Sequence, residues 1–116
     1  VAFGMRAKSL KSNTAVNNKL KKAADKLKIE LKEAKIHSSD VFYREGGTDY
    51  RALHNEKGCL AVEMESFALF HNASVLGKKA ACLLTISDSF VSNEITTSEE
   101  RQNSFTQMME LALTIA

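Results

Sequence analysis

The chain has 116 residues, of which 44% are apolar and 26% charged, with a formal net charge of +2. A chain of this length forms at most one domain, and fractions near the globular average argue against disorder. The small charge excess does not indicate nucleic acid or an anionic membrane as a partner, and no apolar run approaches the ~20 residues that span a bilayer. The cysteines, Cys59 and Cys82, form no CxxC pattern. Two free thiols fit a reducing compartment, so we expect a cytoplasmic location.

Helical and alternating apolar patterns follow one another along the chain, punctuated by Gly, Asn, Asp, Ser and Thr because the sequence lacks proline. Thr48 could cap a short helix that Gly58 ends, and Thr97 with Glu100 makes a capping box. The run from 80 to 86 is the clearest buried strand. The predicted elements are a helix over 14–27, a strand over about 29–36, a short helix over 49–57, a strand over 59–62, a helix over 65–76, a strand over 80–86 and a helix from Thr97.

This alternation predicts an α/β domain whose largely parallel sheet is covered by helices. Ligands in such sheets bind just beyond the carboxyl ends of the strands. Two strand exits carry polar side chains there, Val62–Glu65 and Ile86–Asp88. We therefore expect the functional residues at these two exits.

Glu63 and Glu65 are two residues apart, so in an extended segment both carboxylates point to one side. Carboxylates at a strand exit suit the vicinal hydroxyls of a sugar, because each accepts two hydrogen bonds. The alternative is that they lie at the N-terminus of the next helix and favour its dipole.

Asp88 follows the apolar strand after one small residue, Ser87. A carboxyl group at the mouth of a dry strand can act as a general acid, and the alternative is a turn residue that begins the loop. Arg101 lies in the first turn of the last helix, where a solvated surface arginine is the alternative.

Phe42 and Tyr43 could offer a stacking face to a planar ligand, although core packing explains at least one of them equally well. The three histidines show no metal-ligand spacing, and no glycine-rich nucleotide motif is present. We therefore predict neither a metal nor a cofactor.

Three segments carry a more specific pattern: Val62-Glu63-Met64-Glu65-Ser66, Thr85-Ile86-Ser87-Asp88-Ser89 and Thr96 to Gln102. Their order and spacing closely resemble the carboxyl-terminal half of bacterial-type, hexameric purine nucleoside phosphorylases, within the nucleoside phosphorylase superfamily. The segment Ser38–Tyr43 is similar to the base-site strand exit of that family. Uridine phosphorylases and methylthioadenosine nucleosidases share the Met-Glu element, whereas the Ser-Asp and Glu-Arg-Gln combination favours the purine phosphorylases.

The resemblance implies a three-layer phosphorylase domain with a parallel or mixed central sheet, of which residues 1–116 form the carboxyl-terminal part. It implies that Asp88 protonates the imidazole-ring nitrogen of the purine, assisted by Arg101. Glu65 would bind the ribose hydroxyls. The remaining implied roles are sugar packing for Met64, support of the ribose site for Glu63, base stacking for Phe42, and a base-pocket position for Val62 and Ser87.

The implied reaction is phosphorolysis of a purine nucleoside to free base and ribose-1-phosphate, with phosphate as co-substrate and a homo-oligomer, a hexamer, as the assembly. Asp88 must be neutral to donate a proton, whereas a nearby cation favours its charged form. We therefore expect Arg101 to approach Asp88 only when substrates are bound.

The glycine-rich phosphate loop and the arginines of the family are not recognisable in this sequence. We therefore expect a piece of a longer polypeptide, inactive alone, with sheet edges and apolar faces left open. A non-catalytic fragment that binds nucleoside or assembles with a partner is the competing hypothesis, and a related phosphorylase or nucleosidase is another.

Overall fold

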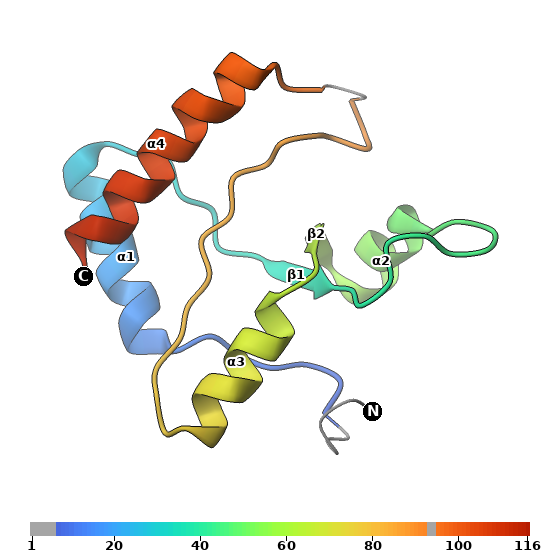
Figure 1. Ribbon diagram of the computed structural model, residues 1–116, viewed down its shortest axis with the longest axis horizontal. Coiled ribbons are helices and arrows are strands. Elements are labelled where there is room, and N and C mark those ends of the chain that lie inside the picture. Colours follow the sequence, from blue (N-terminus) through green and yellow to red (C-terminus); the bar gives the residue numbers. More distant parts are fainter. Residues whose placement is uncertain (1–6, 93–94) are drawn as a thin grey trace.

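The computed structural model describes residues 7–92 and 95–116. Four helices and a two-stranded sheet form in these ranges (Figure 1). The elements are α1 (Thr14–Leu27), β1 (Lys35–Ser38), α2 (Tyr50–Lys57), β2 (Cys59–Glu63), α3 (Ser66–Val75) and α4 (Ser98–Thr114). Helix and strand alternate up to α3, so the predicted α/β class is confirmed.

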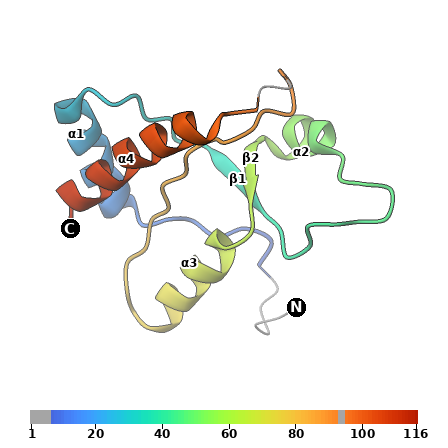
Figure 2. The same cartoon turned by 45° about the horizontal axis from the view of Figure 1, so that its top comes forward.

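Helix α1 has the predicted bounds, and its packing on α4 makes the core. The Asn13 side chain accepts a hydrogen bond from the Val16 amide, which satisfies one free N–H of the first turn. Both views show α1 beside α4 (Figures 1 and 2). The core side chains, each at most 5% exposed, are Leu20, Ala23, Ala24 and Leu111. This small core joins the two helices, and Ala81 and Leu83 from the segment after α3 pack against it.

Strands β1 and β2 run parallel, with Ser38 opposite Glu63 at their shared carboxyl end. The first strand begins six residues later than the predicted 29–36, because the Ile29 amide completes the end of α1 by donating to Ala24. Helix α2 connects the strands and is capped by the Asp49 carboxylate, not by Thr48 as predicted. Gly58 ends it at a φ of +70°, a conformation that glycine adopts without strain.

The predicted strand over 80–86 does not form in the described part of the chain, where these residues are irregular and join neither strand of the sheet. In Figure 1 the segment runs as a coil from the end of α3 towards α4. Leu83 packs on the α1–α4 core, while Leu84 and Ile86 are 41% and 59% exposed. A continuous apolar run is typical of a strand covered on both faces, and this chain covers only one.

The surface of the molecule is large for its mass. The accessible area is 9428 Å² and the radius of gyration 15.4 Å. A compact protein of this size exposes roughly 6,300 Å² and has a radius of gyration of roughly 13 Å. The elements therefore enclose much less apolar surface than a complete domain does.

Candidate functional site

Asp88 and Arg101 are in contact. The Arg101 Nη2 atom lies 3.4 Å from Asp88 Oδ1, and both side chains are about half exposed. The capping box of α4, in which Thr97 and Glu100 bond reciprocally, forms as predicted and fixes Arg101 in the first helical turn. Arg101 is thus not merely a solvated arginine. The expectation that it approaches Asp88 only with substrates bound is not what the structure shows, because the pair is already formed.

Hydrogen bonds between Ser87 and Thr96 connect the segment that carries Asp88 to the start of the helix that carries Arg101. The Thr96 amide donates to the Ser87 carbonyl oxygen at 3.1 Å, and Asp88 and Ile95 form an antiparallel bridge. The Thr96 hydroxyl donates to the same carbonyl at 2.5 Å and accepts from Arg101 Nε at 3.0 Å. The Ser87 hydroxyl donates to Asp88 Oδ2 at 3.1 Å. Both oxygens of the Asp88 carboxylate therefore have a donor.

The turn after Asp88 is made by its neighbour. Ser89 Oγ accepts hydrogen bonds from the amides of Val91 and Ser92, which is the chemistry of a turn residue. The alternative reading of Asp88 as the turn residue is therefore wrong. Asn93 and Glu94, in the same predicted loop, lie outside the described residues.

Glu63 ends β2 and closes the N-terminus of α3. Its carboxylate accepts from the amides of Glu65 and Ser66, at 2.7 and 2.6 Å, and from the Ser66 hydroxyl at 2.5 Å. Partial burial raises the pKa of Glu63, but these bonds and one with Ser38 outweigh it, so the pKa is lowered. The helix-terminus alternative is thus correct for Glu63, whose oxygens are largely occupied.

Glu65 remains the more available carboxylate at this exit. It is exposed and accepts one described hydrogen bond, from the Met64 amide at 3.2 Å. Met64 is 40% exposed beside it, and Val62 is half-buried on β2. The Glu65 carboxylate can accept hydrogen bonds from two hydroxyl groups of a ligand. The Met64 thioether beside it can cover an apolar face of the same ligand.

Cys82, in the 80–86 segment, is influenced by the charges of the first predicted exit. Burial raises the pKa of its thiol, and so do the negative charges of Glu63 and Glu65. These charges relate Cys82 to the end of β2. No hydrogen bond or ion pair found among the described residues joins Asp88 or Arg101 to Glu63 or Glu65. The structure therefore brings Asp88 and Arg101 together, and shows no contact between this pair and Glu65 among the described residues.

Phe42 lies apart from these groups. Its ring is 69% exposed and meets Tyr43 edge-on at 4.8 Å between centroids. None of the contacts found among the described residues joins it to Asp88 or Glu65.

An unpredicted pair, Tyr50 and Phe90, stacks at 4.1 Å between ring centroids and connects α2 to the loop after Asp88. The sequence gives little indication of this contact, because the two rings are forty residues apart in the chain.

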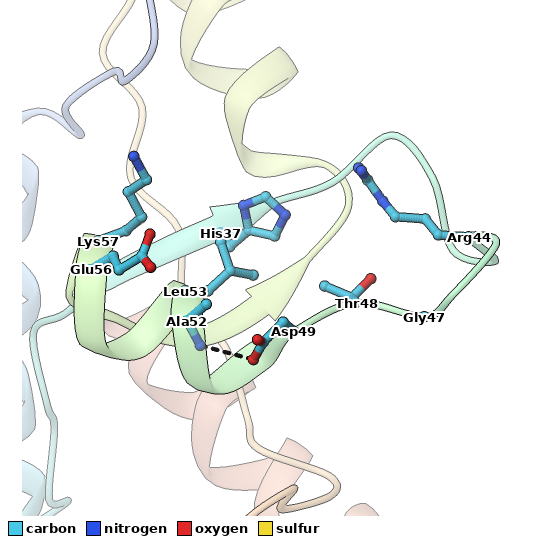
Figure 3. A pocket seen from close by; sticks show the side chains of 9 residues that line it. All are labelled: His37, Arg44, Gly47, Thr48, Asp49, Ala52, Leu53, Glu56 and Lys57. Atoms are coloured by element: carbon cyan, nitrogen blue, oxygen red, sulfur yellow. Dashed lines mark hydrogen bonds between the residues drawn. The ribbon is translucent and has the colours of Figure 1, made fainter.

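A hollow of about 270 Å³ lies between β1, the 44–49 loop and α2 (Figure 3). None of the predicted site residues lines it, and Arg44 and Lys57 extend at its opposite ends.

Within residues 7–92 and 95–116, no cluster of three potential metal ligands occurs. The helices in the same ranges include none that is long and apolar enough to cross a membrane.

Comparison with known sequences identifies the family of the chain. The model of the family described as "Phosphorylase superfamily" matches residues 6–116. The chain therefore belongs to the phosphorylase superfamily.

Its relatives narrow the resemblance to one branch of that superfamily. The chain is 51% identical over 85 residues to the DeoD-type purine nucleoside phosphorylase of Clostridium beijerinckii, covering 73% of this chain and 35% of the relative. Identity to the Mycoplasma genitalium protein of the same name is 48%, over 80% of this chain and 39% of the relative. Identity to the Caldanaerobacter subterraneus protein, also of the same name, is 43%, over 89% of this chain and 45% of the relative. The chain thus spans less than half the length of these relatives, and the predicted resemblance to purine nucleoside phosphorylases is confirmed.

Proposed function

We propose that residues 1–116 are the carboxyl-terminal part of a single purine nucleoside phosphorylase domain. The completed enzyme converts a purine nucleoside and phosphate into free base and ribose-1-phosphate. The observation that carries the proposal is the contact between Asp88 and Arg101, in a chain similar to phosphorylases of that name.

Asp88 is the proposed proton donor. When the glycosidic bond breaks, its electron pair leaves with the base, and a proton from Asp88 to the imidazole-ring nitrogen neutralises that charge. Such acid catalysis contributes about 100- to 10,000-fold to a rate. The 3.4 Å separation from Arg101 is longer than the ~2.8 Å of a tight charge-assisted bond, so the guanidinium has room to move closer as Asp88 becomes anionic.

Glu65 is the proposed ribose ligand. Its exposed carboxylate can accept both vicinal hydroxyls and hold the sugar for phosphate attack on the opposite face, while Met64 covers the sugar. Glu63 supports this site indirectly by ordering the turn that carries Glu65. Val62, Ser87 and Phe42 are the proposed base-pocket residues, and Phe42 reaches the base only if its exposed ring moves towards Asp88.

The proposed assembly is a homo-hexamer in the cytoplasm, with phosphate as co-substrate and no cofactor. No phosphate-binding element is recognisable in this chain, so the remaining part of the domain must supply it. The isolated chain should therefore show little or no turnover.

A phosphate-dependence assay tests the proposal. The completed protein, made by joining this chain behind the amino-terminal part of the Clostridium beijerinckii relative, is given inosine, adenosine or uridine with and without phosphate. We expect base release from the purine nucleosides only with phosphate. Release without phosphate would indicate a nucleosidase, release from uridine alone a uridine phosphorylase, and no release a binding or assembly role.

A further inference from the structure

Thr96 contacts both the Arg101 side chain and the residue that precedes Asp88. Its backbone N–H and its hydroxyl both donate to the Ser87 carbonyl, while the hydroxyl oxygen accepts from Arg101 Nε. Thr96 is half-buried, whereas Asp88 is exposed. One side chain therefore joins the base of the helix that carries Arg101 to the residue that precedes Asp88.

The hydrogen-bond directions of this contact are fully determined. A carbonyl oxygen only accepts and the Arg101 Nε–H only donates, so the Thr96 hydroxyl must use its proton towards Ser87 and a lone pair towards Arg101. Serine can reproduce both bonds. Valine, which has nearly the shape of threonine, can make neither.

We propose that Thr96 is a positioning residue, which fixes the Nε edge of the Arg101 guanidinium so that Nη2 stays directed at Asp88. The catalytic consequence of this inference rests on the proposed function, whereas the contact itself does not. A half-exposed arginine loses considerable rotamer freedom to make one 3.4 Å contact, and such ion pairs are weak by themselves. The Thr96 bond holds the guanidinium in place without engaging the nitrogen that faces Asp88.

The backbone keeps this arrangement separable from folding. The Thr96 amide and the Asp88–Ile95 bridge hold the two strands of the loop without the hydroxyl. A Thr96→Val variant should therefore retain the loop and lose only the tether.

Hydrogen exchange of the Arg101 Nε–H, followed by NMR in this chain, measures the tether directly. We expect exchange about fivefold faster in Thr96→Val and unchanged in Thr96→Ser. Thr106→Val is the matched control, because it removes a hydroxyl that bonds within α4 to Gln102. An Nε–H that exchanges as in a free arginine in the parent chain, or equally in the parent and Thr96→Val, would overturn the proposal.

Kinetics of the completed protein test the consequence for catalysis. Thr96→Val should lower kcat about tenfold, since a misplaced group of this kind is costly, with the KM for the nucleoside changed less than about twofold. Thr96→Ser should restore kcat. Equal changes in kcat and KM, or no rescue by serine, would contradict a positioning role. A completed parent protein without turnover would refute the proposed function instead, and the exchange measurement would then decide the tether alone.

Discussion

The two oxygens of the Asp88 carboxylate face different donors, Arg101 on one side and Ser87 on the other. Because both ionic partners are about half exposed, the pair adds only about 0–1 kcal/mol to stability. Folding alone thus gives little reason for this contact between residues thirteen positions apart. The proposed proton transfer gives this contact a role, because it brings the proposed acid and its assisting cation together.

Cys82 provides a residue-scale test of how strongly the charges at the end of β2 act on the 80–86 segment. Its raised pKa means that the neutral thiol is favoured and the reactive thiolate forms only at higher pH. The stability that it contributes is present below its ordinary pKa of 9.0 and is lost as pH rises through the higher folded value. In a Cys59→Ser background, Glu63→Gln should move the pH midpoint of Cys82 alkylation downwards and speed alkylation at pH 8.5 about twofold.

Two further variants control this measurement. Glu65→Gln should act in the same direction by a smaller amount, because its charge is the weaker of the two contributions. Glu99→Gln, in the first turn of α4, should leave the midpoint unchanged. If neither Glu63→Gln nor Glu65→Gln moved the pH midpoint of Cys82 alkylation, the charges at the end of β2 would not act on Cys82.

At the scale of elements, α3 is held by a cap assembled from two strands. Glu63 accepts from the amides of Glu65 and Ser66, and Ser38 on β1 accepts from the Phe67 amide at 3.3 Å. The lowered pKa of Glu63 means that this contribution is present above its ordinary value of 4.5 and is lost as pH falls through the lower folded value. Acid should therefore loosen the turn that presents Glu65.

Removing the Ser38 hydroxyl tests the shared cap. Ser38→Ala leaves the Phe67 amide without this acceptor and should lower the free energy of unfolding by about 1 kcal/mol, as loss of a helix cap does. Ser39→Ala removes only the two local bonds of its hydroxyl with the Val41 backbone and should change the free energy of unfolding by less than about 0.5 kcal/mol. Urea unfolding followed by circular dichroism measures both, and equal losses would argue against the cap.

Local chemistry made some elements predictable. Asn13 and the box formed by Thr97 and Glu100 set their helix starts within a few residues, and Gly58 sets a helix end, so the sequence is sufficient for α1, α2 and α4. At the start of α3, the place of Glu63 was one of two readings of the sequence, whereas the contact of Ser38 was not predictable because Ser38 lies 29 residues from the amide that it accepts from.

Tertiary context explains the remaining differences. The strand over 80–86 depends on neighbouring strands that this chain does not contain among its described residues. In the candidate site, Asp88, Arg101 and Glu65 follow from the motif, whereas Thr96 acquires its contact only when the loop folds back on Ser87.

For the whole molecule, the open face of the 80–86 segment is the main consequence of its partial length. Ile86 is 59% exposed here but belongs to an apolar run of the kind that is buried on both faces in complete sheets. The remainder of the domain should cover that face in the completed protein.

Ile86→Lys tests this expectation in two contexts. In the isolated chain it should change the free energy of unfolding by less than about 0.5 kcal/mol, whereas in the completed protein a buried lysine should cost about 3 kcal/mol or more. Val91→Lys, at a position that is 95% exposed, should be tolerated in both. Equal tolerance of Ile86→Lys in both proteins would mean that the face stays open.

The most direct measurement compares two substrates of the completed protein after Asp88→Asn. Asparagine keeps the shape of the side chain but has no acidic proton, so turnover of inosine should fall at least about 100-fold. The base of a 7-methylpurine nucleoside already carries a positive charge and needs no proton when it leaves. Turnover of this substrate by Asp88→Asn should therefore fall less than about threefold. An equal loss on both substrates, or full turnover of inosine by Asp88→Asn, would contradict the assignment of Asp88 as the acid.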